Sequence, residues 1–101
     1  MQKKKKPTTH KGLQKMCVAY LEKIPQCKVT SIIPGPYGSK GISDLLVCLK
    51  GWFIAIELKI GDDDPTKLQE WYLGEVAEAG GVAFICRSLE EVKEILDGCE
   101  K

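Results

Sequence analysis

The spacing of apolar residues predicts a small domain of three helices and four strands. Between residues 11 and 24, apolar side chains recur at steps of three and four, as on one face of a helix. Helix-start signals predict two further helices over residues 65–79, with Asp64 as the N-cap, and 88–97, which opens on a Ser-Leu-Glu-Glu capping box. Strands are predicted for the β-branched and apolar runs at residues 27–33, 43–49, 52–60 and 82–86.

The order of these elements (αβββαβα) predicts an α/β fold with helices on both faces of a mixed sheet of about four strands. Lys50-Gly51 separates two strands and suits a hairpin turn, because glycine adopts positive φ at little cost. A helix precedes the last strand, so that strand is expected to pair in parallel. The strand-like runs are almost continuously apolar, which is typical of a sheet covered on both faces.

A chain of 101 residues has room for one domain, which we place at residues 11–101. Residues 1–10 read as a flexible basic arm, because four consecutive lysines stand at positions 3 to 6. Such a run is either a solvated terminus or an attraction for phosphates. No apolar run approaches the roughly 20 residues of a membrane span, and no apolar segment follows the basic start as in a secretory signal. A cytoplasmic protein without a membrane partner is therefore expected.

Five cysteines are spread over the chain, at positions 17, 27, 48, 86 and 99. No two of them are two residues apart, so the spacing predicts neither a zinc site nor a redox pair. An odd, scattered set is also unlike the disulfide framework of a small secreted protein. We expect these residues to be small buried hydrophobes in a reducing compartment, with Cys99 exposed near the end of the chain.

One strand-like run carries charges that its apolar surroundings do not explain. In Phe53 to Ile60, successive side chains alternate between the two faces, so Glu57 and Lys59 point the same way. A two-residue turn at Lys50-Gly51 pairs residue 44 with residue 57 and sets Asp44 opposite Glu57. A three-residue loop would instead place these carboxylates on opposite faces.

Two carboxylates facing each other in a hairpin destabilise it unless a positive charge lies between them. A divalent metal ion fits this position, because hard cations bind carboxylate oxygens, and the backbone carbonyl of Leu58 could add a further oxygen ligand. Lys59 could reach the same place. The alternative is that Glu57 and Lys59 form an ordinary surface salt pair of little consequence.

These residues carry a family resemblance. The segment Gly41-Ile42-Ser43-Asp44, followed by Glu57-Leu58-Lys59 and then Gln69, resembles the VRR-NUC domain, a branch of the PD-(D/E)XK nuclease superfamily often found in phages. The resemblance extends over nearly the whole chain and implies a restriction-endonuclease-like core. It also implies that Asp44 and Glu57 bind the metal, that Lys59 orients or activates the attacking water, and that Gln69 lies beside the site.

The resemblance further implies a Mg²⁺- or Mn²⁺-dependent deoxyribonuclease that needs no small-molecule cofactor. Small members resemble Holliday junction resolvases, so a homodimer acting on branched DNA is expected, with Lys40 and Ser43 as candidate nucleic-acid contacts. The family's acidic residue near the start of the first helix has no counterpart here, because residues 10–15 contain no acid. This departure favours the alternative, a non-catalytic nucleic-acid-binding module on the same fold.

Overall fold

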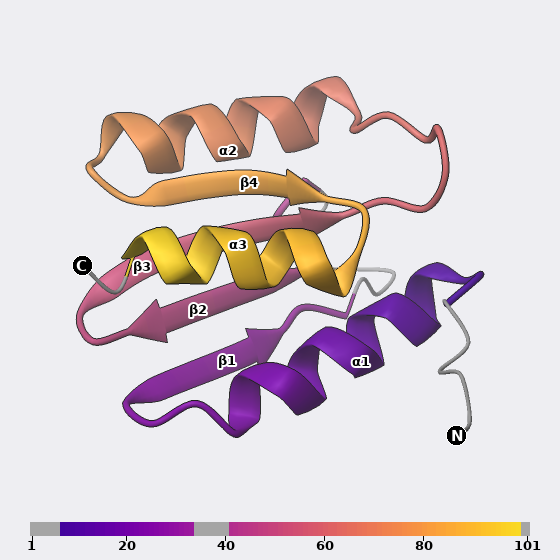
Figure 1. The fold of residues 1–101 in the computed structure, drawn as a ribbon. Helices are drawn as coiled ribbons and strands as arrows, with labels where there is room; N and C mark the ends of the chain where they lie inside the picture. Colours follow the sequence, from indigo (N-terminus) through magenta and orange to yellow (C-terminus); the bar gives the residue numbers. More distant parts are fainter. Residues whose placement is uncertain (1–6, 34–40, 100–101) are drawn as a thin grey trace, which may run out of the picture.

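The computed structural model describes residues 7–33 and 41–99, and these residues form the predicted sequence of elements (Figure 1). Lys40 and the four-lysine run lie outside the described residues. None of the helices in the described ranges has the length and apolar content that crossing a lipid bilayer requires. The elements are α1 (His10–Glu22), β1 (Cys27–Ser31), β2 (Leu45–Leu49), β3 (Trp52–Leu58), α2 (Lys67–Glu78), β4 (Val82–Cys86) and α3 (Leu89–Cys99).

The four strands form one mixed sheet in the order β1-β2-β3-β4. The β1–β2 and β2–β3 pairs are antiparallel, and β4 pairs in parallel with β3 as predicted. Lys50 and Gly51, with φ of 49° and 89°, make the tight turn between β2 and β3. Because Leu45 pairs with Ile56, the predicted register of this hairpin is confirmed.

Helices lie on both faces of the sheet (Figure 1). The larger core forms where α1 and α3 cover one face, and it buries alternate residues of the two central strands: Leu45, Val47 and Leu49 of β2 and Ile54, Ile56 and Leu58 of β3. On the other face α2 covers Ala55 with Leu73 and Val76. This second face is covered only in part, because Cys48 is exposed and Phe53 keeps 43% of its surface accessible.

The helix ends correct two expectations. Thr66, not Asp64, is the N-cap of α2: its hydroxyl accepts a hydrogen bond from the Gln69 N–H at 3.1 Å. At the other end of the chain, α3 continues through Gly98 to Cys99, beyond the predicted end at residue 97. Cys99 is 8% exposed and joins the larger core, so burial of this side chain stabilises the two additional helical residues despite the glycine.

The burial of the cysteines also differs from expectation. Cys17, Cys86 and Cys99 are buried, whereas Cys48 is exposed and Cys27 is half-buried. Cys48 lies on the sheet face that α2 covers incompletely, which explains its exposure. Burial raises the pKa of the Cys17 thiol to about 11 and that of Cys86 to about 12.

Candidate functional site

Asp44 and Glu57 come together at one end of the β2–β3 hairpin. Asp44 stands directly before β2, and Glu57 is the residue before the last of β3. The N–H of Leu58 donates a 2.8 Å hydrogen bond to Oδ2 of Asp44, so the aspartate reaches across the hairpin to the neighbouring strand. The structure thus confirms the predicted neighbourhood of the two carboxylates.

Glu57 is a buried carboxylate that lacks part of its hydrogen bonding. Its side chain is 1% exposed, and Oε1 has no hydrogen-bond partner among the described residues. The other oxygen, Oε2, lies 3.4 Å from Nζ of Lys59. Burial, and secondarily the charge of Asp44, raises the pKa of Glu57 to about 7, although Lys59 acts in the opposite direction. Such a site gains stability from a cation that supplies the missing partner.

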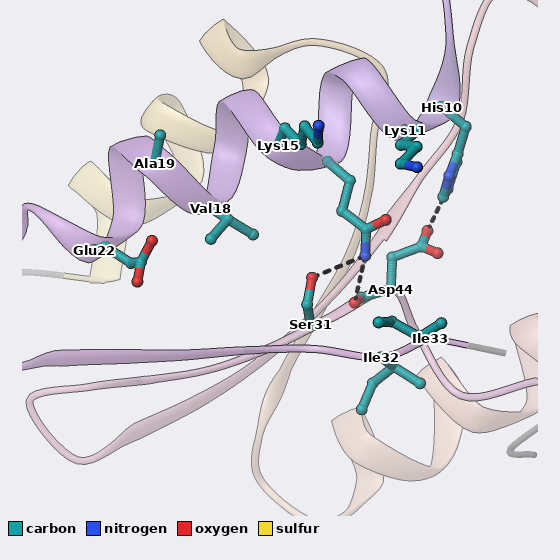
Figure 2. Close-up of a pocket in the computed structure, with 11 residues that line it drawn as sticks. His10, Lys11, Lys15, Val18, Ala19, Glu22, Ser31, Ile32, Ile33 and Asp44 are labelled. Carbon is teal, nitrogen blue, oxygen red and sulfur yellow. Dashed lines mark hydrogen bonds and ion pairs between the residues drawn. The ribbon is translucent and has the colours of Figure 1, made fainter.

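His10 joins this site, although the sequence placed it in the flexible arm. It is the first residue of α1, whose N-cap Thr9 accepts a hydrogen bond from the Gly12 N–H. Its Nε2 lies 3.0 Å from Oδ2 of Asp44, with the imidazole pointing at the carboxylate (Figure 2). The available signal was Thr9, a residue type favoured at N-caps, which starts the helix at position 10.

A second residue of α1 fixes the helix beside Asp44. The Gln14 amide donates to the hydroxyl of Ser31 at 3.0 Å and to the backbone carbonyl of Asp44 at 3.4 Å. Gln14 thereby ties the first half of α1 to the end of β1 and to the segment just before β2. This amide was not among the predicted site residues.

Gln69 is engaged in capping α2. Its Oε1 accepts a hydrogen bond from the Thr66 N–H at 2.8 Å, and the two residues complete a capping box. Among the described residues, Gln69 makes no hydrogen bond to Asp44, Glu57 or Lys59. The first turn of α2 still lies against the segment before Asp44, because a Cβ placed on Gly41 would be 2.5 Å from Cγ of Leu68.

The remaining predicted residues divide between the site and the fold. Lys59 is 16% exposed at the site. Ser43, expected to contact nucleic acid, is instead 1% exposed and donates to the Leu45 carbonyl at 3.4 Å, so its hydroxyl serves the fold. Leu58 holds Asp44 through its N–H, and a role for its carbonyl stays a prediction.

The donor set suits a metal that takes part of its coordination from elsewhere. Within the described ranges, no group of three or more His, Cys, Asp or Glu side chains is arranged to hold a metal ion. Mg²⁺ is commonly bound by one or two carboxylates, with water and substrate phosphates completing the octahedron. Asp44 and the unpartnered oxygen of Glu57 fit that pattern.

The chain shares its fold with solved VRR_NUC structures. One, titled "VRR_NUC domain", superposes with a TM-score of 0.73 at 22% identity, covering 90% of this chain and 97% of that chain. Another, titled "VRR_NUC domain protein", gives a TM-score of 0.70 at 15% identity, covering 92% and 88%. No family model and no curated protein matches the sequence. The expected fold is therefore confirmed by structural similarity.

Proposed function

We propose that this chain, which has the fold of VRR_NUC domains, is a metal-dependent nuclease that hydrolyses phosphodiester bonds in DNA. The observation that carries the proposal is the buried carboxylate of Glu57, whose Oε1 has no partner among the described residues, next to Asp44. Two carboxylates and a lysine at a strand end make a poor structural element. They make a suitable site for a hard cation and a phosphate.

Each residue of the site has a distinct task in this proposal. Asp44 and Glu57 hold Mg²⁺ or Mn²⁺, which supplies Lewis-acid polarisation of the phosphoryl oxygen. The Leu58 N–H orients the carboxylate of Asp44. The Lys59 ammonium, which contacts Glu57, orients the attacking water or offsets the charge that develops on the phosphate.

The side-chain amide of Gln69 uses its oxygen, but not its NH₂ group, in a hydrogen bond that stabilises the fold. Its oxygen caps α2, while the NH₂ group makes no hydrogen bond within the described part of the chain. In our proposal this NH₂ group donates to the substrate. The hydrogen bond that caps α2 therefore also fixes the orientation of the amide whose NH₂ group meets the substrate.

For the substrate we propose branched DNA, cut by a homodimer. One chain of 101 residues offers little surface for choosing a substrate, and two copies would present two sites. The outer side of α2 exposes Trp71, whose side chain is 61% accessible. Aromatic residues are enriched at protein interfaces, which supports this side of α2 as the contact between copies.

The test compares cutting of a labelled four-way junction and of the matching linear duplex with Mg²⁺, Mn²⁺ or EDTA. We expect metal-dependent cutting that Glu57→Ala and Asp44→Ala each reduce by about a hundredfold or more. Glu78→Ala, at the exposed end of α2, is the matched control and keeps full activity. The ratio of junction to duplex cutting measures the preference for branched DNA.

The start of the first helix, residues 10–15, carries no acidic residue, and this favours a second function, a nucleic-acid-binding module without catalysis. Binding of the same DNA with no cutting in either metal would support that function and contradict the first. The Asp44→Ala variant would then bind DNA as the parent does. These outcomes distinguish the two functions whichever of the DNA molecules is preferred.

A further inference from the structure

A groove runs along α1 and opens onto the candidate site (Figure 2). It lies between one side of α1 and the end of β1, with a cavity volume of about 600 Å³. Asp44 and His10 line one end, and Glu22 lies at the other end of the helix (Figure 2). A DNA strand bound at the candidate site would therefore meet the groove directly.

The walls of the groove combine cationic and apolar side chains. Lys11 and Lys15, one helical turn apart, line it from α1, and within the described residues neither ammonium has a carboxylate within ion-pair distance. Val18 on the helix and Ile33 after β1 supply apolar surface. Ile33 is 83% exposed, so its apolar surface is accessible to a ligand in the groove.

This combination matches the chemistry of unpaired nucleotides. Lysines attract phosphates, whereas apolar side chains contact the faces of bases that no complementary strand covers. Pockets of roughly 300–1,000 Å³ enclose small molecules, so this volume suits about one or two nucleotides. The hydrogen bonds of Gln14 to Ser31 and to the Asp44 backbone hold the two walls together before any ligand arrives.

We propose that the groove binds unpaired nucleotides of the strand that is cut, with phosphates beside Lys11 and Lys15 and a base against Ile33 and Val18. This inference rests on the proposed nuclease function and specifies its substrate. Among branched DNAs, those with an unpaired strand next to the branch are preferred. A fully paired junction is a weaker substrate than a flap or an overhang of the same sequence.

Binding is measured in EDTA, where no metal-dependent cutting takes place. The probes are a labelled oligothymidylate and a blunt duplex of the same length, followed by fluorescence anisotropy over a range of salt. We expect Lys11→Glu/Lys15→Glu to weaken single-strand binding by about tenfold or more at low salt. The slope of log K against log salt should fall in magnitude by about 1.4, since each lost phosphate contact on a single strand removes about 0.7.

Two further variants distinguish binding in the groove from non-specific electrostatic attraction. Lys28→Glu/Lys50→Glu makes the same change in charge at exposed lysines outside the groove and leaves single-strand binding within about twofold of the parent. Ile33→Ser lowers affinity by about three- to tenfold without changing the salt slope, because it removes an apolar contact and no charge. Neither substitution touches a buried residue.

Several outcomes would overturn the inference. Equal losses from the two lysine pairs would mean non-specific attraction, and unchanged binding in Lys11→Glu/Lys15→Glu would mean that the groove takes no nucleic acid. A change of oligomeric state in Ile33→Ser would make the groove a protein contact. If groove variants lose binding while no substrate is cut, the groove stands and the nuclease proposal fails. If cutting depends on Glu57 while groove variants bind normally, the nuclease proposal stands and the groove inference fails.

Discussion

Glu57 is the residue whose chemistry conflicts most with the stability of the fold. Its buried carboxylate has one oxygen without a partner in the described structure. We expect Glu57→Gln to raise the unfolding free energy of the metal-free protein by roughly 1–3 kcal/mol at pH 8, because it removes a buried charge. The same variant should lose cutting. Urea unfolding in EDTA measures the first effect, with exposed Glu78→Gln as the control.

The pH dependence of stability gives Glu57 a second signature within the same experiment. Its pKa is about 7 in the fold, against an ordinary value of 4.5. Between these pH values the folded state keeps a proton that the unfolded state has lost, so the contribution of Glu57 to the unfolding free energy falls as pH rises from 4.5 to 7 and levels off above. Glu57→Gln should lack this component. Identical pH profiles for parent and variant would contradict the burial of an ionisable group here.

The sequence predicted Asp44, Glu57 and Lys59 because strand alternation and a two-residue turn are local rules. The observed pairing of Leu45 with Ile56 confirms the register on which that argument depends. His10 escaped prediction because its contact with Asp44 joins residues far apart in the chain. The unpartnered oxygen of Glu57 likewise depends on three-dimensional packing, which strand periodicity does not describe.

At the scale of elements, the start of α2 links capping to the site. Gln69→Glu retains a capping-box residue but replaces the NH₂ group with a carboxylate oxygen. We expect its unfolding free energy to stay within about 0.5 kcal/mol of the parent, while cutting falls by about tenfold or more. Gln69→Ala should lose cutting and about 0.5–1 kcal/mol of stability. Full activity in a stable Gln69→Glu variant would show that Gln69 acts only as a helix cap.

Helix boundaries show where local signals compete. Asp64 and Pro65 form a plausible helix start, yet Thr66 and Gln69 satisfy two backbone N–H groups and fix the N-cap two residues later. At the start of α3, the hydroxyl of Ser88 accepts a hydrogen bond from the Glu91 N–H, as the predicted capping box requires. The Glu91 carboxylate, however, accepts from the N–H of Arg87 at 3.4 Å and not from that of Ser88. The presence of each helix was thus predictable, and the choice among neighbouring caps was settled by geometry.

At the scale of the whole molecule, the fold leaves the outer side of α2 open to a partner. We expect the protein in solution to have a mass of about 22 kDa, twice the 11.2 kDa of one chain. Trp71→Glu places a charge where a large apolar side chain is 61% exposed, and should give a monomer with unchanged helix content. Light scattering after size exclusion measures the mass, and Glu75→Gln on the same helix is the control.

The monomeric variant also separates assembly from catalysis. Each chain carries its own Asp44, Glu57 and Lys59, so a Trp71→Glu monomer should still cut a single site in a metal-dependent manner. Paired incision of a branched substrate needs two sites held together and should be lost. If the parent is already monomeric yet makes paired cuts, the second incision comes from a second encounter with the DNA. The outer side of α2 would then serve another partner.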